Sequence, residues 1–416
     1  MSAPRKRRAA VTGIGVVAPG GTSTETFWKS TQEGVSVLDR VTREGCEHLP
    51  LKVAGEVRSF EPSAAVEERY LVQTDRFTHF AMAAADAALQ DAQLGQADTD
   101  AAPFSAGVVT AAGSGGGEFG QRELQKLWSK GSRYVGPWQS IAWFYAASTG
   151  QVSIRRGFKG PCSVVAADEA GGLDALAHAA RAVERGTDVM VAGSTEAPLA
   201  PYSMVCQLGY RELSPVADPE RAYRPFTEEA CGFVPAEGGA MLAVEAAGAA
   251  RERGVPVRAL LAGHASTFTG ASRWELSREG LAEAIRGALA EAGCAPEEVD
   301  VVFADALGVP EADRAEALAL ADALGAHGRR VPVTAPKTGT GRAYCAAPVL
   351  DAAAAVLAME NGLIPPTPNV SDICHDLDLV TGRARAAEVR TALVLSRGLM
   401  GSNSALVLRH GAAEAS

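Results

Sequence analysis

The chain has 416 residues, 47% of them hydrophobic, and a formal net charge of −10 at pH 7. This length is enough for a large core arranged in one or two domains. The acidic balance argues against nucleic acid and anionic membrane surfaces as partners. The seven cysteines show no metal-binding spacing, and their odd number favours reduced thiols in the cytoplasm.

No segment has the pattern of a membrane span or a signal peptide, so we expect no membrane partner. The basic residues 5–8 run directly into a strand pattern rather than into a hydrophobic leader. The most apolar helical pattern, at 346–359, contains Asp351 and is too short to cross a bilayer.

Strand and helix patterns alternate along the first 250 residues. Short apolar and β-branched runs predict strands, and Ala- and Leu-rich runs predict helices. In chain order we expect a strand at 9–17, a helix at 76–93, strands at 106–112 and 162–167, a helix at 173–185, and strands at 189–193 and 240–245.

Two glycine-rich turns could suggest nucleotide binding, but each lacks a required partner. The turn at 12–21 has no acidic ribose ligand at the right distance, and Pro19 interrupts the helix entry. The turn at 113–117 lacks the Lys-Ser/Thr of a phosphate-binding loop. We therefore expect no cofactor, and no metal.

The second half repeats this order after a polar connection at 246–255. We place a boundary there, giving an N-terminal half at 1–250 and a C-terminal half at 251–416. The expected strands are 260–267, 301–304, 331–334, 392–396 and 405–408, and the expected helices are 278–292, 312–324 and 346–359. Alternating strands and helices predict an α/β fold with largely parallel sheets covered on both faces.

The stretch around residue 169 has the pattern of a catalytic elbow. The buried strand at 162–167 is followed by a sharp turn at 168–172 and by the helix at 173–185. Many α/β enzymes place a nucleophile at such a turn, where the helix N-terminus stabilises a developing anion. The tip of this turn is Glu169, where acyl chemistry needs Cys or Ser.

The run at 168–175, DEAGGLDA, resembles the E-Q-A-G-G-L-D-A run of chain length factors, which are ketosynthase-β subunits of bacterial type II aromatic polyketide synthases. Active ketosynthases carry C-T-S-G-L-D there. The stretch at 224–238 resembles their R-P-F-D…G-F-V-x-G-E-G run, with Thr227 for Asp and Ala236 for Gly. The resemblance covers nearly the whole chain. It implies a thiolase-like five-layer αβαβα fold made of two similar halves.

The resemblance also implies that both catalytic histidines of the family are replaced. Asp305 stands at the histidine position of the A-H-G motif, and Arg342 stands at that of K-[ST]-x-x-G-H, whose Lys337 is retained. Arg cannot act as a base because it stays protonated. Since the family counterparts converge, we expect Glu169, Asp305 and Arg342 to meet, with the one Arg between two carboxylates.

In chain length factors the segment after the strand at 106–112 closes the far end of the polyketide tunnel. Bulky residues there shorten the tunnel, and this chain has small ones, namely Ala112, Gly113, Gly116 and Gly117. By this resemblance we expect a pocket for a long chain, roughly eighteen to twenty carbons rather than about sixteen.

Residues 134–150 hold four of the twelve tryptophan and tyrosine residues of the chain. This enrichment fits either a core or a subunit interface, and the resemblance favours the interface. The residues expected there are Tyr134, Trp138, Trp143 and Phe144, with Val164 and Val165 on a strand that pairs across the interface.

The sequence therefore predicts a non-catalytic, chain-length-determining subunit. It would pair with a catalytic ketosynthase-α subunit, and an acyl carrier protein would deliver malonyl units. The alternative is an independent malonyl-carrier protein decarboxylase or a ketosynthase-like homodimer, in which a protonated Glu169 would donate a hydrogen bond.

Overall fold

The computed structural model describes residues 7–270 and 274–414, in which eleven strands form one continuous hydrogen-bonded sheet. Only two residue pairs join β1 to β8, so the strands separate into two sheets that meet at this seam. The strands of the first sheet, from its outer edge to the seam, are β5 (Cys162–Val165), β4 (Ala106–Ala111), β6 (Val189–Glu196), β7 (Gly238–Ala246) and β1 (Ala9–Val17). Those of the second, from the seam outward, are β8 (Ala259–Phe268), β15 (Ser402–His410), β14 (Thr391–Arg397), β9 (Val301–Phe303), β10 (Pro332–Thr334) and β12 (Asp378–Leu379).

The two sheets repeat one topology. If the main strands of each half are numbered along the chain, both sheets have the order 3-2-4-5-1. The fold class is confirmed, and each sheet is largely parallel, as expected, with one strand running the other way. The fifth strand of each half, β7 or β15, is antiparallel to both of its neighbours. In the second half the reason is visible in the chain, because only the four residues 398–401 join β14 to β15. Such a short connection allows a hairpin and no parallel crossover.

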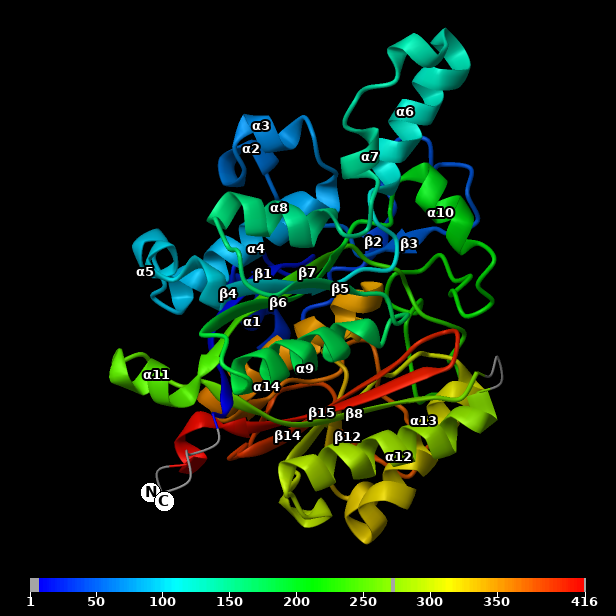
Figure 1. Cartoon of the computed structure of the whole chain (residues 1–416). Helices are drawn as coiled ribbons and strands as arrows, with labels where there is room; N and C mark the ends of the chain where they lie inside the picture. The colour runs from blue at the N-terminus through cyan, green and yellow to red at the C-terminus, as the bar shows by residue number, and fades with distance from the viewer. Residues whose placement is uncertain (1–6, 271–273, 415–416) are drawn as a thin grey trace.

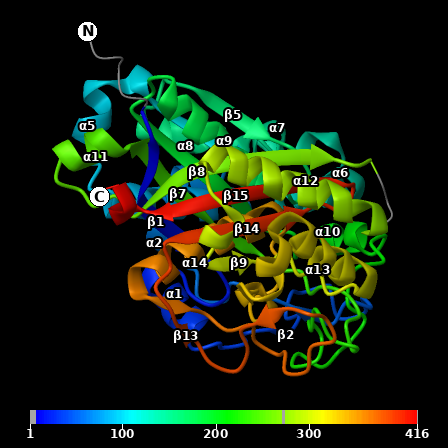
Figure 2. The same cartoon turned by 90° about the horizontal axis from the view of Figure 1, so that it is seen from below.

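Helices cover both sheets and fill the space between them (Figure 1). The central layer is α9 (Gly171–Glu184) and α14 (Ala347–Asn361), which contact both sheets. The outer face of the first sheet carries α4 (Arg76–Asp91) and α8 (Ala147–Arg156), and that of the second carries α12 (Trp274–Ala292) and α13 (Pro310–Leu324) (Figure 2). Helix α14 is buried on nearly every side, as its largely apolar sequence requires.

The first glycines of the expected turn at 12–21 lie in strand β1 and have a packing role. A Cβ at Gly13 or Gly15 of β1 would lie within about 2 Å of a backbone oxygen of α4, and Gly263 of β8 meets α12 in the same way. The G-x-G pattern therefore lets strand and helix approach closely, and the two halves share this device.

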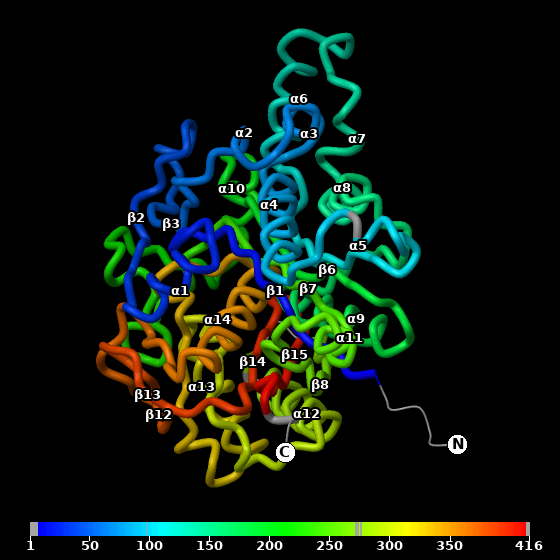
Figure 3. The backbone as a smooth tube through the Cα atoms, turned by 90° about the vertical axis from the view of Figure 1, so that its left-hand side faces the viewer, coloured from blue at the N-terminus to red at the C-terminus, as the bar shows by residue number. Residues whose placement is uncertain are grey.

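A long excursion leaves the body of the fold after β4. It contains α6 (Gly117–Lys130) and α7 (Gln139–Ala142), which project beyond the outer helical layer (Figure 3). Beside its base lies α10 (Pro201–Gln207). The remaining helices are α1 (Thr24–Gln32), α2 (Pro62–Ala65), α3 (Glu68–Leu71), α5 (Gln96–Ala101) and α11 (Ala247–Glu252), and the short strands are β2 (Asp39–Arg40), β3 (Val53–Ala54), β11 (Leu363–Ile364) and β13 (Arg385–Ala386). Across residues 7–270 and 274–414, no helix combines the length and apolarity that a membrane crossing requires.

Candidate functional site

The strand–turn–helix elbow forms as expected, with β5 leading into the turn and α9 beginning at Gly171. Asp168 has φ +54°, in the left-handed region that non-glycine residues avoid. The turn is held by the hairpin loop after β14: the Met400 N–H donates to Asp168 Oδ2 at 2.6 Å, and the Leu399 N–H donates to Glu169 Oε2 at 2.9 Å.

Glu169 is buried at the tip of the elbow, with 3% of its surface exposed. Burial and the neighbouring Asp168 carboxyl raise the pKa of Glu169 well above its usual range, against the attraction of the Arg342 charge. The charged form of this carboxyl is therefore disfavoured relative to an exposed glutamate, at the position where an active enzyme would carry a thiolate.

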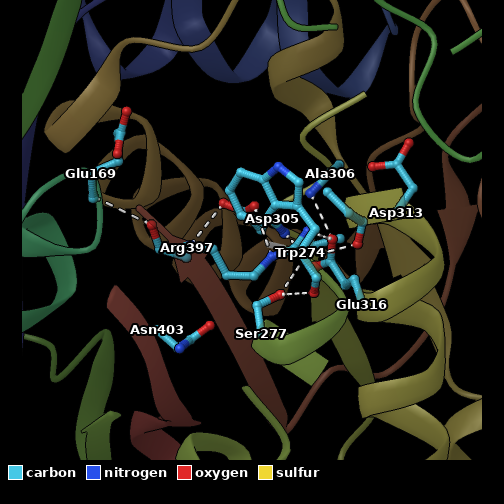
Figure 4. A network of polar contacts seen from close by, with 12 residues as sticks. Glu169, Trp274, Ser277, Asp305, Ala306, Asp313, Glu316, Arg397 and Asn403 are labelled. Atoms are coloured by element: carbon cyan, nitrogen blue, oxygen red, sulfur yellow. Dashed lines mark hydrogen bonds and ion pairs between the residues drawn. The ribbon is translucent and has the colours of Figure 1, made fainter. Parts of the chain in front are cut away.

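The two histidine positions belong to an ionic cluster, of which Figure 4 labels Asp305, Arg397 and Glu316. Arg342 Nη1 lies 2.8 Å from Asp305 Oδ1, and Arg397 Nε lies 3.1 Å from Asp305 Oδ2. Arg397 also pairs with Glu316 at 2.9 Å. All four residues are fully buried, with at most 1% exposed. Burial would raise the pKa of Asp305, but the charges of Arg342 and Arg397 outweigh it and lower that pKa.

The expected arrangement of one arginine between two carboxylates is therefore wrong. Within the described part of the chain, no ion pair joins Glu169 to Arg342. Instead, the carboxylate of Asp305 lies between two arginines. The second of them, Arg397 at the end of β14, was missed because a single arginine in an apolar strand gives no indication of its partner.

Lys337, the retained lysine of the second histidine motif, contacts the backbone beside this cluster. Its Nζ lies 2.6 Å from Asp351 Oδ2 of α14 and donates to the carbonyl oxygens of Ala304 and Asp305 at 2.5 and 3.2 Å. It thus fixes the backbone at Asp305 to the central helical layer.

Two buried acids, Glu316 of the cluster and Asp313, hold the turn after β9. Glu316 accepts from the N–H groups of Asp305 and Ala306 at 2.7 and 2.9 Å. Asp313 accepts from those of Gly308 and Phe226 at 3.0 and 2.9 Å. In this chain both carboxylates satisfy buried backbone donors, which is a structural task.

The elbow and the expected gate share one cavity of about 370 Å³. Glu169 lines it, as do Ala112, Gly113 and Gly117, whereas Gly116 does not. A Cβ at Gly117 would lie 2.1 Å from Ser203 Oγ of α10, so that hydroxyl occupies the space that a larger residue would need. The structure thus brings the elbow and three of the four expected gate residues together.

The expected interface residues lie on the surface. Tyr134, Trp138, Trp143 and Phe144 are between 39% and 56% exposed, which excludes the core interpretation for these four. Val164 and Val165 are half-buried on β5, the outermost strand of its sheet. The chain therefore presents an aromatic surface and an unpaired strand edge.

Comparison with known proteins gives the family. The model of the β-ketoacyl synthase N-terminal domain matches residues 6–250, and that of the C-terminal domain matches residues 258–371. The chain belongs to the β-ketoacyl synthase family.

Two of its relatives carry polyketide synthase names. It is 77% identical to a putative polyketide beta-ketoacyl synthase 2 of Streptomyces coelicolor, over 98% of this chain and 96% of that protein. It is 50% identical to the tetracenomycin polyketide synthase ketoacyl synthase beta subunit of Streptomyces glaucescens, over 99% and 100% of the two. Within the family, the chain is thus of the ketosynthase-β type.

Two solved structures have the same fold. The ishigamide ketosynthase/chain length factor has a TM-score of 0.89 at 26% identity and covers 97% of this chain and 99% of its own. A type II polyketide ketosynthase in complex with its acyl carrier protein has a TM-score of 0.87 at 29% identity, covering 98% and 100%.

Proposed function

We propose that this chain is the chain length factor of a type II polyketide synthase, a non-catalytic subunit that shapes the tunnel for a growing poly-β-ketone. The carrying observation is the site itself: the elbow is intact, but Glu169, Asp305 and Arg342 replace its nucleophile and both histidines. Decarboxylative condensation needs a thiolate and imidazoles that stabilise the developing enolate. A catalytic ketosynthase-α subunit therefore supplies the chemistry, and an acyl carrier protein delivers malonyl units and holds the product.

The surface supports a heterodimer. Strand β5 has a free edge, which pairs with the corresponding strand of the partner and continues the sheet. The aromatic side chains of 134–145 lie on the excursion beside it and are the type that dominates subunit interfaces. A permanent pair of this kind buries on the order of 2,000 Å² or more.

In this proposal the cavity determines the length of the polyketide product. Ala112, Gly113 and Gly117 line it together with Trp143, which is also exposed on the aromatic surface. A chain that enters from the partner across this surface would reach these small residues last. We keep the proposal of a long product, roughly eighteen to twenty carbons, because the three gate residues carry little side-chain volume.

Two further statements belong to the proposal. The repeated strand order supports the division into halves at residues 1–250 and 251–416. A cytoplasmic location is supported by the seven cysteines, all of which are free thiols.

The test is co-expression with a type II ketosynthase-α subunit encoded in the same gene neighbourhood, followed by turnover of malonyl-carrier protein. We expect a one-to-one complex, and chain extension only by the complex. A homodimer of this chain that turns over malonyl-carrier protein alone would overturn the proposal. It would favour the alternative of an independent decarboxylase, for which the position of Glu169 in the cavity wall, together with its raised pKa, is the supporting observation.

A further inference from the structure

Residues 113–119, here called the gate segment, form part of the cavity wall. The last three of them are the first residues of α6. Its backbone is irregular until α6 starts at Gly117, and Gly115 has φ +63°. Irregular backbone beside a cavity keeps one shape only if its polar groups are fixed by partners. Two buried carboxylates from different elements supply those partners.

The first carboxylate is Glu196 at the end of β6, which is fully buried. Its oxygens accept from the Gly113 N–H at 2.5 Å, from the Ser114 hydroxyl at 2.5 Å and from the Ser114 N–H at 3.4 Å. One side chain thus holds the start of the gate segment.

The second carboxylate is Asp75, which is 1% exposed and is the N-cap residue of α4. It accepts from the Phe77 N–H of its own helix at 3.3 Å and from the Phe119 N–H of α6 at 2.7 Å. It therefore caps α4 and holds the end of the gate segment with the same side chain.

Gly116 allows this second contact. A Cβ there would lie 2.9 Å from the Asp75 Cβ and 1.9 Å from the Ala142 carbonyl oxygen. The absent side chain lets the gate segment pack against Asp75 and α7. This explains why Gly116 does not line the cavity, although it is as small as its neighbours.

We propose that Asp75 and Glu196 are positioning residues for product length: by anchoring both ends of the gate segment, they fix the depth of the cavity. This rests on the proposed function. Loss of either anchor leaves buried N–H groups unpaired, which costs about 1–3 kcal/mol per group. The segment then relaxes, the wall formed by Gly113, Ser114 and Gly117 moves, and chains of other lengths fit.

The experiment uses the heterodimer with Asp75→Asn, Glu196→Gln or the milder Ser114→Ala, which removes only the hydroxyl contact to Glu196. The control is Asp98→Asn, since Asp98 accepts from the Gly95 N–H at 2.8 Å at the exposed start of α5, away from the cavity. We expect an intact complex and about a fivefold rise in products of non-native length for the anchor variants, with no change for the control. An unchanged length distribution in all three anchor variants would overturn the proposal.

A second readout separates this proposal from the proposed function. Amide hydrogen exchange at residues 113–119, measured on the same complexes, should accelerate in the anchor variants and not in Asp98→Asn. Unchanged exchange would overturn the anchoring whatever the product. Faster exchange with an unchanged product length would instead show that the gate segment does not set length, and would count against the proposed function of this cavity.

Discussion

Arg397 Nε and Asp305 Oδ2 lie 3.1 Å apart, and both side chains are completely removed from solvent. In an active ketosynthase the position of Asp305 belongs to a histidine, by the resemblance of the motif. In this chain two buried arginines neutralise the carboxylate that stands at this position. A buried ion pair stabilises little compared with apolar packing, but removing one partner is costly.

The first prediction concerns this pair. Arg397→Met should lower the free energy of unfolding by about 3–5 kcal/mol, because it leaves Glu316 without its buried cation and Asp305 with Arg342 alone. The exposed pair Arg329–Asp376 is the control: Arg329→Met should cost less than about 1 kcal/mol. Urea unfolding of both variants measures the difference, and equal losses would contradict the role of burial.

The second prediction concerns the nucleophile. Glu169→Cys should restore no condensing activity in the isolated chain, because Arg342 and Asp305 cannot stabilise an enolate or move its proton. Arg342→His should destabilise the fold rather than activate it, since Asp305 then loses its 2.8 Å partner. Malonyl-carrier turnover and thermal unfolding measure the two effects. Turnover by Glu169→Cys alone would show that the missing thiol is the whole defect.

The third prediction concerns pH. Burial raises the pKa of Asp313 from 3.8 to about 7, against its two backbone hydrogen bonds. The native chain therefore keeps a proton that the unfolded chain has lost. The stability from this carboxyl is present below about pH 4 and is lost as the pH rises to about 7. Asp313→Asn should flatten the fall in unfolding free energy between about pH 4 and about pH 7. Urea titrations at several pH values test this, and parallel curves for variant and wild type would refute it.

The fourth prediction concerns the gate. Gly117→Leu should shorten the product, because its side chain must displace Ser203 and enter the cavity. The double variant Gly117→Leu with Ser203→Gly relieves the contact with α10 while keeping the added volume. Mass spectrometry of the products should therefore find shorter chains for both variants, with better assembly of the double variant. Products of native length from the double variant would place the tunnel end elsewhere.

The fifth prediction concerns assembly. Phe144→Ala should weaken the heterodimer by about 2 kcal/mol, or roughly thirtyfold in affinity, if this aromatic surface is a hot spot. Phe104 is 74% exposed and lies before β4, outside the excursion, so Phe104→Ala is the matched control. Titration of labelled subunits measures both affinities. Equal affinities for the two variants would move the interface away from the excursion.

Periodicity predicted the main elements because each is a buried apolar run. The expected strand at 9–17 is β1 itself, and the expected helix at 76–93 differs from α4 only at its end. At the elbow, the helix begins at Gly171 rather than at residue 173. Glycine is tolerated there because the first N–H groups of a helix have no partner within it.

Other features depend on tertiary contacts and leave little trace in the sequence. Helix α6 was not predicted, because it begins with glycine, is largely polar and leaves Trp128 83% exposed. Asp75 caps α4 next to it in the chain, but its second bond, to Phe119, joins residues 44 positions apart. Arg397 likewise pairs with Asp305, which lies 92 positions away in the sequence. Motif positions predicted which catalytic groups are missing, and only the structure identifies what has replaced their contacts.

The hairpin loop after β14 has a consequence for biosynthesis of the chain itself. Leu399 and Met400 donate the hydrogen bonds that hold Glu169 and Asp168 in the elbow turn, about 230 residues earlier. A ribosome releases these donors only after it has made both halves. The first half can collapse early during translation, but its turn stays without these bonds until β14 and the loop after it emerge. Folding of the elbow is thus a late event, and the first half made alone should not complete it.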